Sequence, residues 1–157
     1  MDKKTLKTYA IGILIPLAVG GIGGFFTSMG MDSFDALTKP PLTPPPILFP
    51  IVWTILYVLM GIGSARIYMA PPTATRNHGL IVYVIQLAVN FLWSIIFFNL
   101  GAYGFAFFWL LLLLGLVITM IYLFSKVDKL SALLQIPYAI WVTFAGYLTL
   151  MIWLLNK

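Results

Sequence analysis

The sequence predicts an all-α integral membrane protein, built as a bundle of five transmembrane helices with a Pro-rich loop that caps a ligand pocket. Hydrophobic residues make up 62% of the 157 residues and charged residues only 8%, whereas soluble domains average about 25% charged residues. A helix needs roughly 20 apolar residues to cross a bilayer. Uncharged runs of that length or more fill most of the chain, at 8–31, 40–65, 79–125 and 130–156.

The first predicted span covers about 8–29, and the second about 46–69. Each contains two small residues four positions apart, Gly20 with Gly24 and Gly61 with Ala65. Such pairs let helices approach closely in a membrane. Ordinary packing inside the bundle is the commoner use of the pattern, and a homodimer contact is the alternative left open.

Prolines crowd the entrance to the second span, in the stretch "KPPLTPPPILFP". These prolines stiffen the loop of residues 30–46, and a long loop of this composition is more typical of a semi-rigid lid than of disorder. We therefore expect Pro41 to belong to a lid over the pocket. Thr43 is expected to cap the first helical turn. Pro50 cannot donate a backbone hydrogen bond, which predicts a free Pro46 carbonyl at the pocket mouth.

The third uncharged run is too long for one helix, and "NLGAYG" at 99–104 divides it into spans of about 79–99 and 103–125. The fifth span covers about 130–155, with a kink or a start at Pro137. These five spans leave little chain for anything else, so residues 1–157 are interpreted as one membrane domain.

The basic residues predict how the bundle is oriented. With the N-terminus in the cytoplasm, seven of the nine basic residues lie inside and only Lys39 and Lys157 lie outside. The net charge of +5 therefore reflects topology and gives no reason to expect a nucleic-acid partner. We expect a multi-pass protein of a bacterial cell membrane with the C-terminus outside.

Ionisable residues are missing from the middle of every span, which argues against an ion-coupled pump. On the third span, Gln86, Asn90, Trp93 and Phe97 share one helical face. Asn90 lies at mid-membrane and needs a hydrogen-bond partner. Its amide either ties helices together, which is the commoner role, or lines a cavity.

Aromatic residues form faces on two other spans. Trp53, Tyr57 and Met60 share a face of the second span, and the fifth span has a similar face made of Tyr138, Trp141, Ala145 and Leu148. Walls of this kind suit a flat hydrophobic small molecule. The chain has no cysteine and only one histidine, His78 in a loop, so a metal-free tetrapyrrole fits the pocket better than haem. No metal site and no required cofactor are expected.

Four blocks give the sequence a resemblance to the TspO/MBR family of tryptophan-rich sensory proteins and translocator proteins, the peripheral-type benzodiazepine receptors. The blocks are "KPPLTPP" (39–45), "WTILYVLMGIGSA" (53–65), "QLAVNFLWSIIFF" (86–98) and "PYAIWVTFAGYL" (137–148). Their order and spacing match across nearly the whole chain.

The resemblance implies a five-helix bundle whose outer half encloses a pocket under the loop before the second span. It implies porphyrin as ligand or substrate, and benzodiazepine-type compounds or sterols as further ligands. By position, the implied pocket residues are Trp53, Tyr57, Asn90, Trp93, Trp141, Ala145 and Leu148. Early in the fourth span this chain has Phe105 and Trp109 where animal members have a tryptophan and an acidic residue, so Phe105 is expected to line a pocket wall of altered selectivity.

Three functions follow as alternatives. The first is a membrane receptor or sensor that binds porphyrins and related flat ligands. The second is light-dependent porphyrin degradation, in which Trp53 and Trp141 would take the catalytic roles that the resemblance implies for them. No conventional acid, base or metal constellation accompanies the pair, so such chemistry would have to come from the ligand. The third, a tetrapyrrole transporter, lacks support from inverted repeats or intramembrane charges.

Overall fold

A computed structural model describes all residues, 1–157, and contains only helices and their connections. In chain order the elements are α1 (Lys3–Met29), α2 (Met31–Asp35), α3 (Leu48–Met69), α4 (Ala74–Ser94), the π-helical turn η1 (Ile95–Asn99), α5 (Tyr103–Ser125), α6 (Lys129–Leu133) and α7 (Ile136–Asn156). Five helical segments are long and apolar enough to cross a membrane: 3–29, 48–69, 74–99, 103–125 and 129–156. The protein is an integral, multi-pass membrane protein of the predicted fold class.

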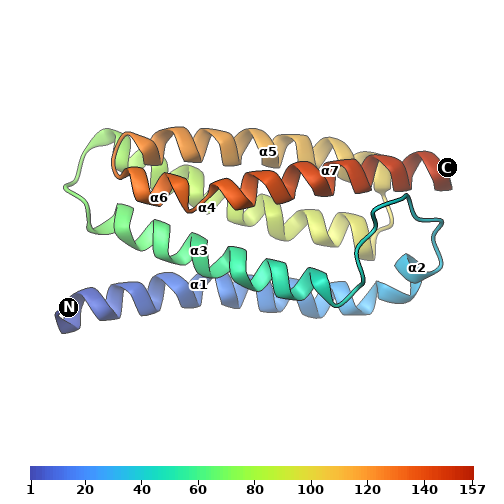
Figure 1. Cartoon of the computed structure of the whole chain (residues 1–157), viewed down its shortest axis with the longest axis horizontal. Coiled ribbons are helices and arrows are strands. Elements are labelled where there is room, and N and C mark those ends of the chain that lie inside the picture. Colours follow the sequence, from blue (N-terminus) through green and yellow to red (C-terminus); the bar gives the residue numbers. More distant parts are fainter.

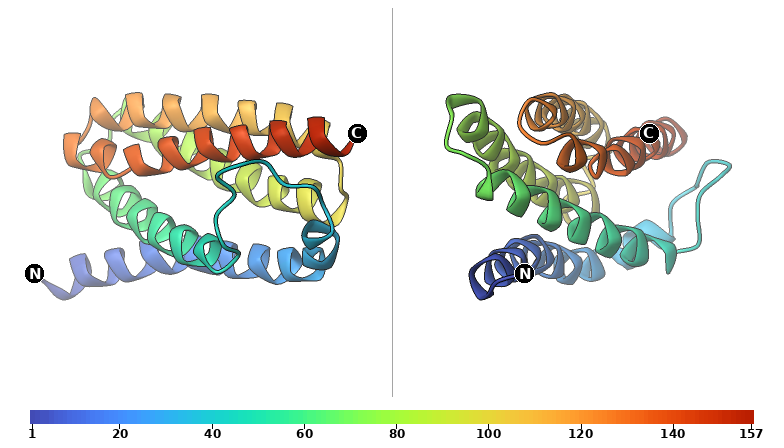
Figure 2. Two further views of the ribbon diagram at one scale, coloured as in Figure 1. Left: turned by 45° about the vertical axis from the view of Figure 1, so that its right-hand side comes forward. Right: turned by 60° about the vertical axis from the view of Figure 1, so that its left-hand side comes forward.

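The long helices lie side by side along the long axis of the molecule (Figure 1). The turns after α3 and α5 lie at the end where α1 begins, which we call the N-terminal end. The loop of residues 36–47, which we call the lid, lies at the opposite end with the C-terminus, and we call this the lid end. Figure 2 shows α1 and α3 on one side of the bundle, α5 and α7 on the other, and α4 between them.

The helix boundaries differ from the sequence expectation where a side chain caps a turn. α1 begins at Lys3 rather than near residue 8, because the Asp2 carboxylate accepts a hydrogen bond from the Thr5 N–H at 2.7 Å. α4 begins at Ala74 rather than Gly79, because the Thr73 hydroxyl oxygen accepts from the Arg76 N–H at 3.1 Å. The expected span at 130–155 is divided into α6 and α7, and Pro137 lies in the first turn of α7.

The entry to α3 corrects two expectations. Thr43 does not cap α3; its hydroxyl donates to the Pro40 carbonyl at 2.7 Å and closes a turn within the lid. The Pro46 carbonyl is not free, because it accepts from the Phe49 N–H at 3.3 Å in a tighter, three-residue turn. The start of α3 therefore has no unpaired Pro46 carbonyl to offer to a ligand.

Small residues allow α1 and α3 to cross closely near the N-terminal end. A Cβ atom on Gly61 would lie 2.6 Å from the Gly12 carbonyl oxygen, and one on Gly12 would lie 3.0 Å from the Ala65 Cβ. Gly61 and Ala65 thus serve packing inside the bundle. In contrast, Gly24, in the half of α1 toward the lid end, has open space beside it.

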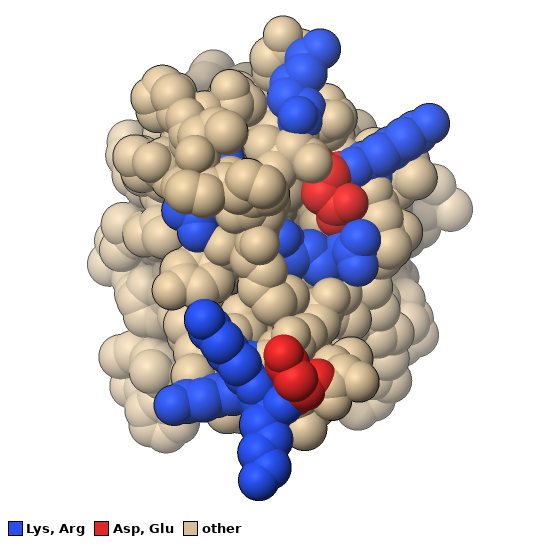
Figure 3. Space-filling view, turned by 90° about the vertical axis from the view of Figure 1, so that its left-hand side faces the viewer, with Lys and Arg blue, Asp and Glu red and all other residues tan.

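The core fills the space between α3, α4, α5 and α7, and its fully buried side chains include Met60, Ile67, Leu113, Val117, Met120, Phe124, Tyr138, Val142 and Ile152. At the N-terminal end, Arg66 of α3 makes a bidentate pair with Asp128 before α6, with Nε–Oδ2 at 2.7 Å and Nη2–Oδ1 at 3.2 Å. This end also carries exposed lysine and arginine side chains (Figure 3).

Candidate functional site

A cavity of about 500 Å³ lies in the half of the bundle next to the lid. Its walls come from α1, α2, α3, α4, η1, α7 and the lid, and the volume falls in the range of about 300–1,000 Å³ typical of small-molecule sites. α3 and α7 diverge toward the lid end in both Figure 1 and Figure 2. Side chains fill the space between α3 and α7 only in part at this end, and the cavity is the space that remains.

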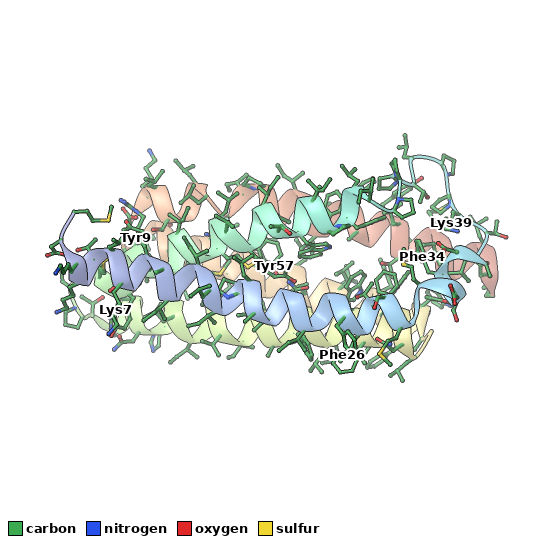
Figure 4. All side chains as sticks on the ribbon, turned by 90° about the horizontal axis from the view of Figure 1, so that it is seen from below. Lys7, Tyr9, Phe26, Phe34, Lys39 and Tyr57 are labelled. Atoms are coloured by element: carbon green, nitrogen blue, oxygen red, sulfur yellow. The ribbon has the colours of Figure 1, made fainter.

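Trp53 of α3 forms one wall of the cavity. Its indole stacks on the Tyr57 ring, with centroids 5.6 Å apart and planes 27° apart. The buried ring of Tyr138 meets Trp53 edge-on at 6.2 Å. Figure 4 shows Tyr57 near the middle of the bundle, so this aromatic group closes the deep end of the cavity.

The facing wall comes from the end of α4 and from η1. Trp93 stacks on Phe97 with centroids 5.4 Å apart, and Phe98 meets the Phe97 ring edge-on at 4.7 Å. The π-helical turn adds a residue to the ladder, and with it both Phe97 and Phe98 line the cavity. Asn99 holds the turn against α1 by donating from Nδ2 to the Phe26 carbonyl at 2.8 Å.

Trp141 of α7 completes the aromatic lining. Its ring packs against Phe49 at the start of α3, with centroids 6.0 Å apart at 66°. Ala145 and Leu148 continue the same face of α7 along the cavity. Alanine at this point leaves room that a larger side chain would fill.

Polar groups in the wall are neutral, and three of them are unpaired donors. Asn90 is 3% exposed and lines the cavity, and its Nδ2 has no hydrogen-bond partner in the protein. The indole N–H groups of Trp93 and Trp141 are likewise unpaired. Gln86 provides the interhelical tie instead, because its Oε1 accepts from the Tyr138 hydroxyl at 2.6 Å. Between the two roles left open for Asn90, the geometry favours the cavity wall.

The structure brings most of the residues expected in the pocket to this cavity, namely Pro50, Trp53, Tyr57, Asn90, Trp93, Trp141, Ala145 and Leu148. Phe105 is not among them: it lies on the outer face of α5, is 60% exposed and packs beside Trp109. Placing Phe105 in a pocket wall was wrong, because its position on α5 turns it away from the bundle interior. The Trp109 indole instead donates to the Val89 carbonyl at 2.8 Å.

Pro41 also lies outside the cavity lining, on the exposed part of the lid. Its carbonyl accepts a hydrogen bond from the Tyr147 hydroxyl of α7 at 3.0 Å. A second tie joins the lid to the end of α7, where the Asn156 amide accepts from the Thr38 N–H at 2.9 Å and donates to the Thr38 carbonyl at 2.8 Å. The lid therefore docks on α7 through backbone groups.

Sequence analysis missed four aromatic residues of the lining, including Phe91 of α4, and one glycine-rich surface. Phe34 reaches the cavity from α2, Phe49 from the start of α3, and Phe98 from η1. Gly20, Gly21 and Gly24 form part of the α1 wall. The glycine pattern was visible in the sequence, but it was assigned only to helix packing.

The cavity wall carries no Asp, Glu, Lys, Arg or His side chain. Its chemistry is therefore that of an apolar, aromatic site with a few neutral hydrogen-bond donors, which suits binding and orienting a flat hydrophobic molecule. Its hydroxyl groups, such as those of Thr54, Tyr57 and Ser94, have no histidine or carboxylate beside them in the lining to act as a general base.

Comparison with known proteins gives consistent matches along the chain. The model of the TspO/MBR family matches residues 12–154. The protein CrtK of Rhodobacter capsulatus is 38% identical over 153 residues, covering 97% of this chain and 94% of that protein. The tryptophan-rich protein TspO of Chlorobaculum tepidum is 36% identical, with 98% of both chains covered. The translocator protein of Bos taurus is 32% identical, covering 94% of this chain and 90% of the bovine protein.

Proposed function

The chain belongs to the TspO/MBR family, and we propose that it is a membrane receptor for porphyrin-type tetrapyrroles and related flat hydrophobic ligands. The observation that carries the proposal is the cavity next to the lid, whose facing walls are aromatic and whose lining has no charge. Benzodiazepine-type compounds and sterols share the apolar character that such a wall accepts, and we include them as secondary ligands.

The geometry supports this ligand class at two points. The stacked pairs Trp53–Tyr57 and Trp93–Phe97 present ring surfaces on which a planar ligand gains both apolar burial and aromatic contact. Asn90, Trp93 and Trp141 each have an unpaired buried donor. Leaving a buried donor unpaired costs about 1–3 kcal/mol, so a ligand atom that accepts a hydrogen bond from one of them would be stabilised. Ring nitrogens or carbonyl oxygens of a ligand are suitable acceptors.

A fluorescence titration tests the proposal. Protoporphyrin added to the protein in lipid nanodiscs should quench tryptophan emission saturably. Trp141→Ala should weaken binding by roughly fivefold to tenfold, since one aromatic contact is worth about 1–1.5 kcal/mol beyond the buried area. Phe105→Ala is the matched control, because it removes an aromatic ring at the same end of the bundle but outside the cavity. Quenching no greater than in empty nanodiscs would refute porphyrin binding.

Light-dependent porphyrin degradation is the second candidate, favoured by one observation: Trp53 and Trp141 line the same cavity. An excited ring bound there would accept one electron from an indole beside it, which leaves an indole radical cation and a porphyrin radical anion, and dissolved oxygen would be the oxidant for ring cleavage. Illumination of the bound porphyrin, followed through its absorption bands, should show loss that slows in the Trp53→Phe, Trp141→Phe double variant. Equally fast loss in wild type and double variant would remove the two indoles from the chemistry.

We further propose that the N-terminal end faces the cytoplasm of a bacterial cell and the lid end faces outward. Seven of the nine basic residues support this orientation, because they lie at the termini and turns of the N-terminal end. Reporter fusions at Lys157 and in the turn at residues 70–73 would report opposite sides of the membrane.

A further inference from the structure

The neutral lining of the cavity constrains where a charged part of the ligand can lie. Porphyrin-type tetrapyrroles carry carboxylate side chains along one edge of the ring. An ionised carboxylate is strongly disfavoured in an apolar environment unless a cation or several donors meet it. Because no cationic side chain lines the cavity, the carboxylate edge has to stay at the opening, and the opposite edge enters first.

Lys39 of the lid is the cation that contacts a residue of the cavity lining at the lid end, and we take this as the side on which the opening lies. Its Nζ lies 5.0 Å from the ring centroid of Phe34, and Phe34 is 5% exposed and lines the cavity. Figure 4 shows Phe34 and Lys39 together at the lid end, beyond Tyr57 along the bundle. One residue, Phe34, therefore separates the Lys39 ammonium group from the ligand space.

The Lys39 ammonium group has no acidic partner. It donates to the backbone carbonyls of Asp35 at 3.0 Å and Leu37 at 3.4 Å, and an ammonium group has three donors. The Asp32 and Asp35 side chains of α2 are exposed and neither pairs with it; the protein has a single salt bridge, Arg66–Asp128, at the other end. The charge of Lys39 is thus held in place by carbonyl groups and remains uncompensated.

We propose that Lys39 anchors a ligand carboxylate at the cavity mouth, so that the preferred ligand is a flat apolar ring with a carboxylate on one edge. The proposal rests on the proposed function and adds the ligand's charge and direction of entry. A carboxylate there accepts the third ammonium hydrogen bond. It also braces the lid, because Lys39 follows Thr38, whose backbone is bonded to Asn156.

The test compares protoporphyrin as the free diacid with its dimethyl ester, titrated into phosphatidylcholine nanodiscs that contain wild type, Lys39→Met or Lys39→Arg. Lys39→Met should weaken diacid binding by about tenfold, the size expected for one charge-assisted hydrogen bond, and should change ester binding less than twofold. Lys39→Arg should retain most of the diacid affinity. Lys157→Met removes the only other basic residue expected on the outer side of the membrane, and it should leave the affinity for both ligands unchanged.

The ester separates the charge of Lys39 from its bonds within the lid, since both ligands depend on an intact lid but only the diacid carries the carboxylates. Equal weakening of diacid and ester by Lys39→Met would reduce Lys39 to a lid-bracing residue and overturn the proposal. Unchanged binding of both ligands would overturn it as well. If neither ligand binds wild type, the proposed function itself fails, which is a different result.

Discussion

Tyr138 and Gln86 form the main side-chain hydrogen bond in the buried interior, directly below the cavity. Tyr138 is 1% exposed and Gln86 fully buried, and the tyrosine ring also supports the edge of Trp53. In a membrane protein such a bond has no competing water nearby, so its loss leaves a buried acceptor unpaired. The pair fixes α4 against α7 and holds one wall of the site.

Tyr138→Phe should therefore lower the stability of the protein by about 1–3 kcal/mol, the cost of an unpaired buried acceptor. Thermal or denaturant unfolding in detergent measures the difference. Tyr122→Phe is the control, because Tyr122 is 60% exposed and the side-chain hydrogen bond that it receives, from the Ser125 hydroxyl, goes to its backbone carbonyl, which the substitution keeps. Equal stability of Tyr138→Phe and wild type would show that the Gln86 bond contributes nothing.

At the level of single residues, the sequence predicted the cavity lining best where a residue's helical face and the family resemblance agreed. Trp53, Asn90 and Trp141 are examples. Phe105 was misplaced because an uninterrupted apolar helix such as α5 gives no sign of which face is buried. Phe34 and Phe98 were missed because their positions depend on the path of the lid and on the extra residue of η1.

At the scale of elements, the crossing of α1 and α3 depends on Gly61. Gly61→Ala should destabilise the protein by about 1–3 kcal/mol, because its Cβ would overlap backbone atoms of Gly12 and Ile13 and the helices would have to separate. Gly115→Ala in α5 is the matched control, since nothing lies within 4 Å of the added methyl group. If both variants unfold at the same temperature as wild type, the close crossing is not required.

Acid should lower the stability of the protein through Asp128, which lies between α5 and α6. The hydrogen bonds from Arg66 lower the pKa of Asp128 to about 2, with Ser131 adding to the effect. Because this pKa lies below the value of about 3.9 for an unfolded aspartate, the ion pair contributes stability above about pH 4 and loses it as the pH falls toward 2.

Asp128→Asn should flatten the acid limb of the stability profile in that pH range and lower stability near neutral pH by about 1 kcal/mol, a value discounted because the pair is partly exposed to solvent. Asparagine retains the helix cap of α6, so the variant isolates the charge. Unfolding temperatures of wild type and variant from pH 7 to pH 2.5 provide the check. Parallel profiles would rule out Asp128 as a source of acid sensitivity.

Element boundaries were predictable where a charge or a glycine-containing break marks the end of a span. α5 covers 103–125 as expected, because "NLGAYG" precedes it and Lys126 follows it. The short helices α2 and α6 were not anticipated, because five residues carry too little periodicity to be recognised. The π-helical turn has no sequence signature that would distinguish it from the α-helix it extends. In the structure it is marked by the hydrogen bond from the Leu100 N–H to the Ile95 carbonyl, five residues back, at 3.0 Å, and Asn99 ties it to α1.

At the scale of the whole molecule, the two ends of the bundle serve different purposes. The N-terminal end is closely packed, with the glycine crossing of α1 and α3 and the Arg66–Asp128 pair holding the helices together. Toward the lid end α3 and α7 diverge, and the lid closes over the space through backbone bonds to Asn156 and Tyr147. Because one end of the bundle is closely packed and the helices diverge at the other, a single bundle encloses a cavity without a separate domain.

A structure of the protein with protoporphyrin bound would show whether this cavity is a tetrapyrrole site. We expect the ring between the Trp53 and Trp93 walls, in contact with Trp141, and a carboxylate within hydrogen-bond distance of the Lys39 ammonium group. A porphyrin bound on the lipid-facing surface, with the cavity walls uncontacted, would contradict this expectation.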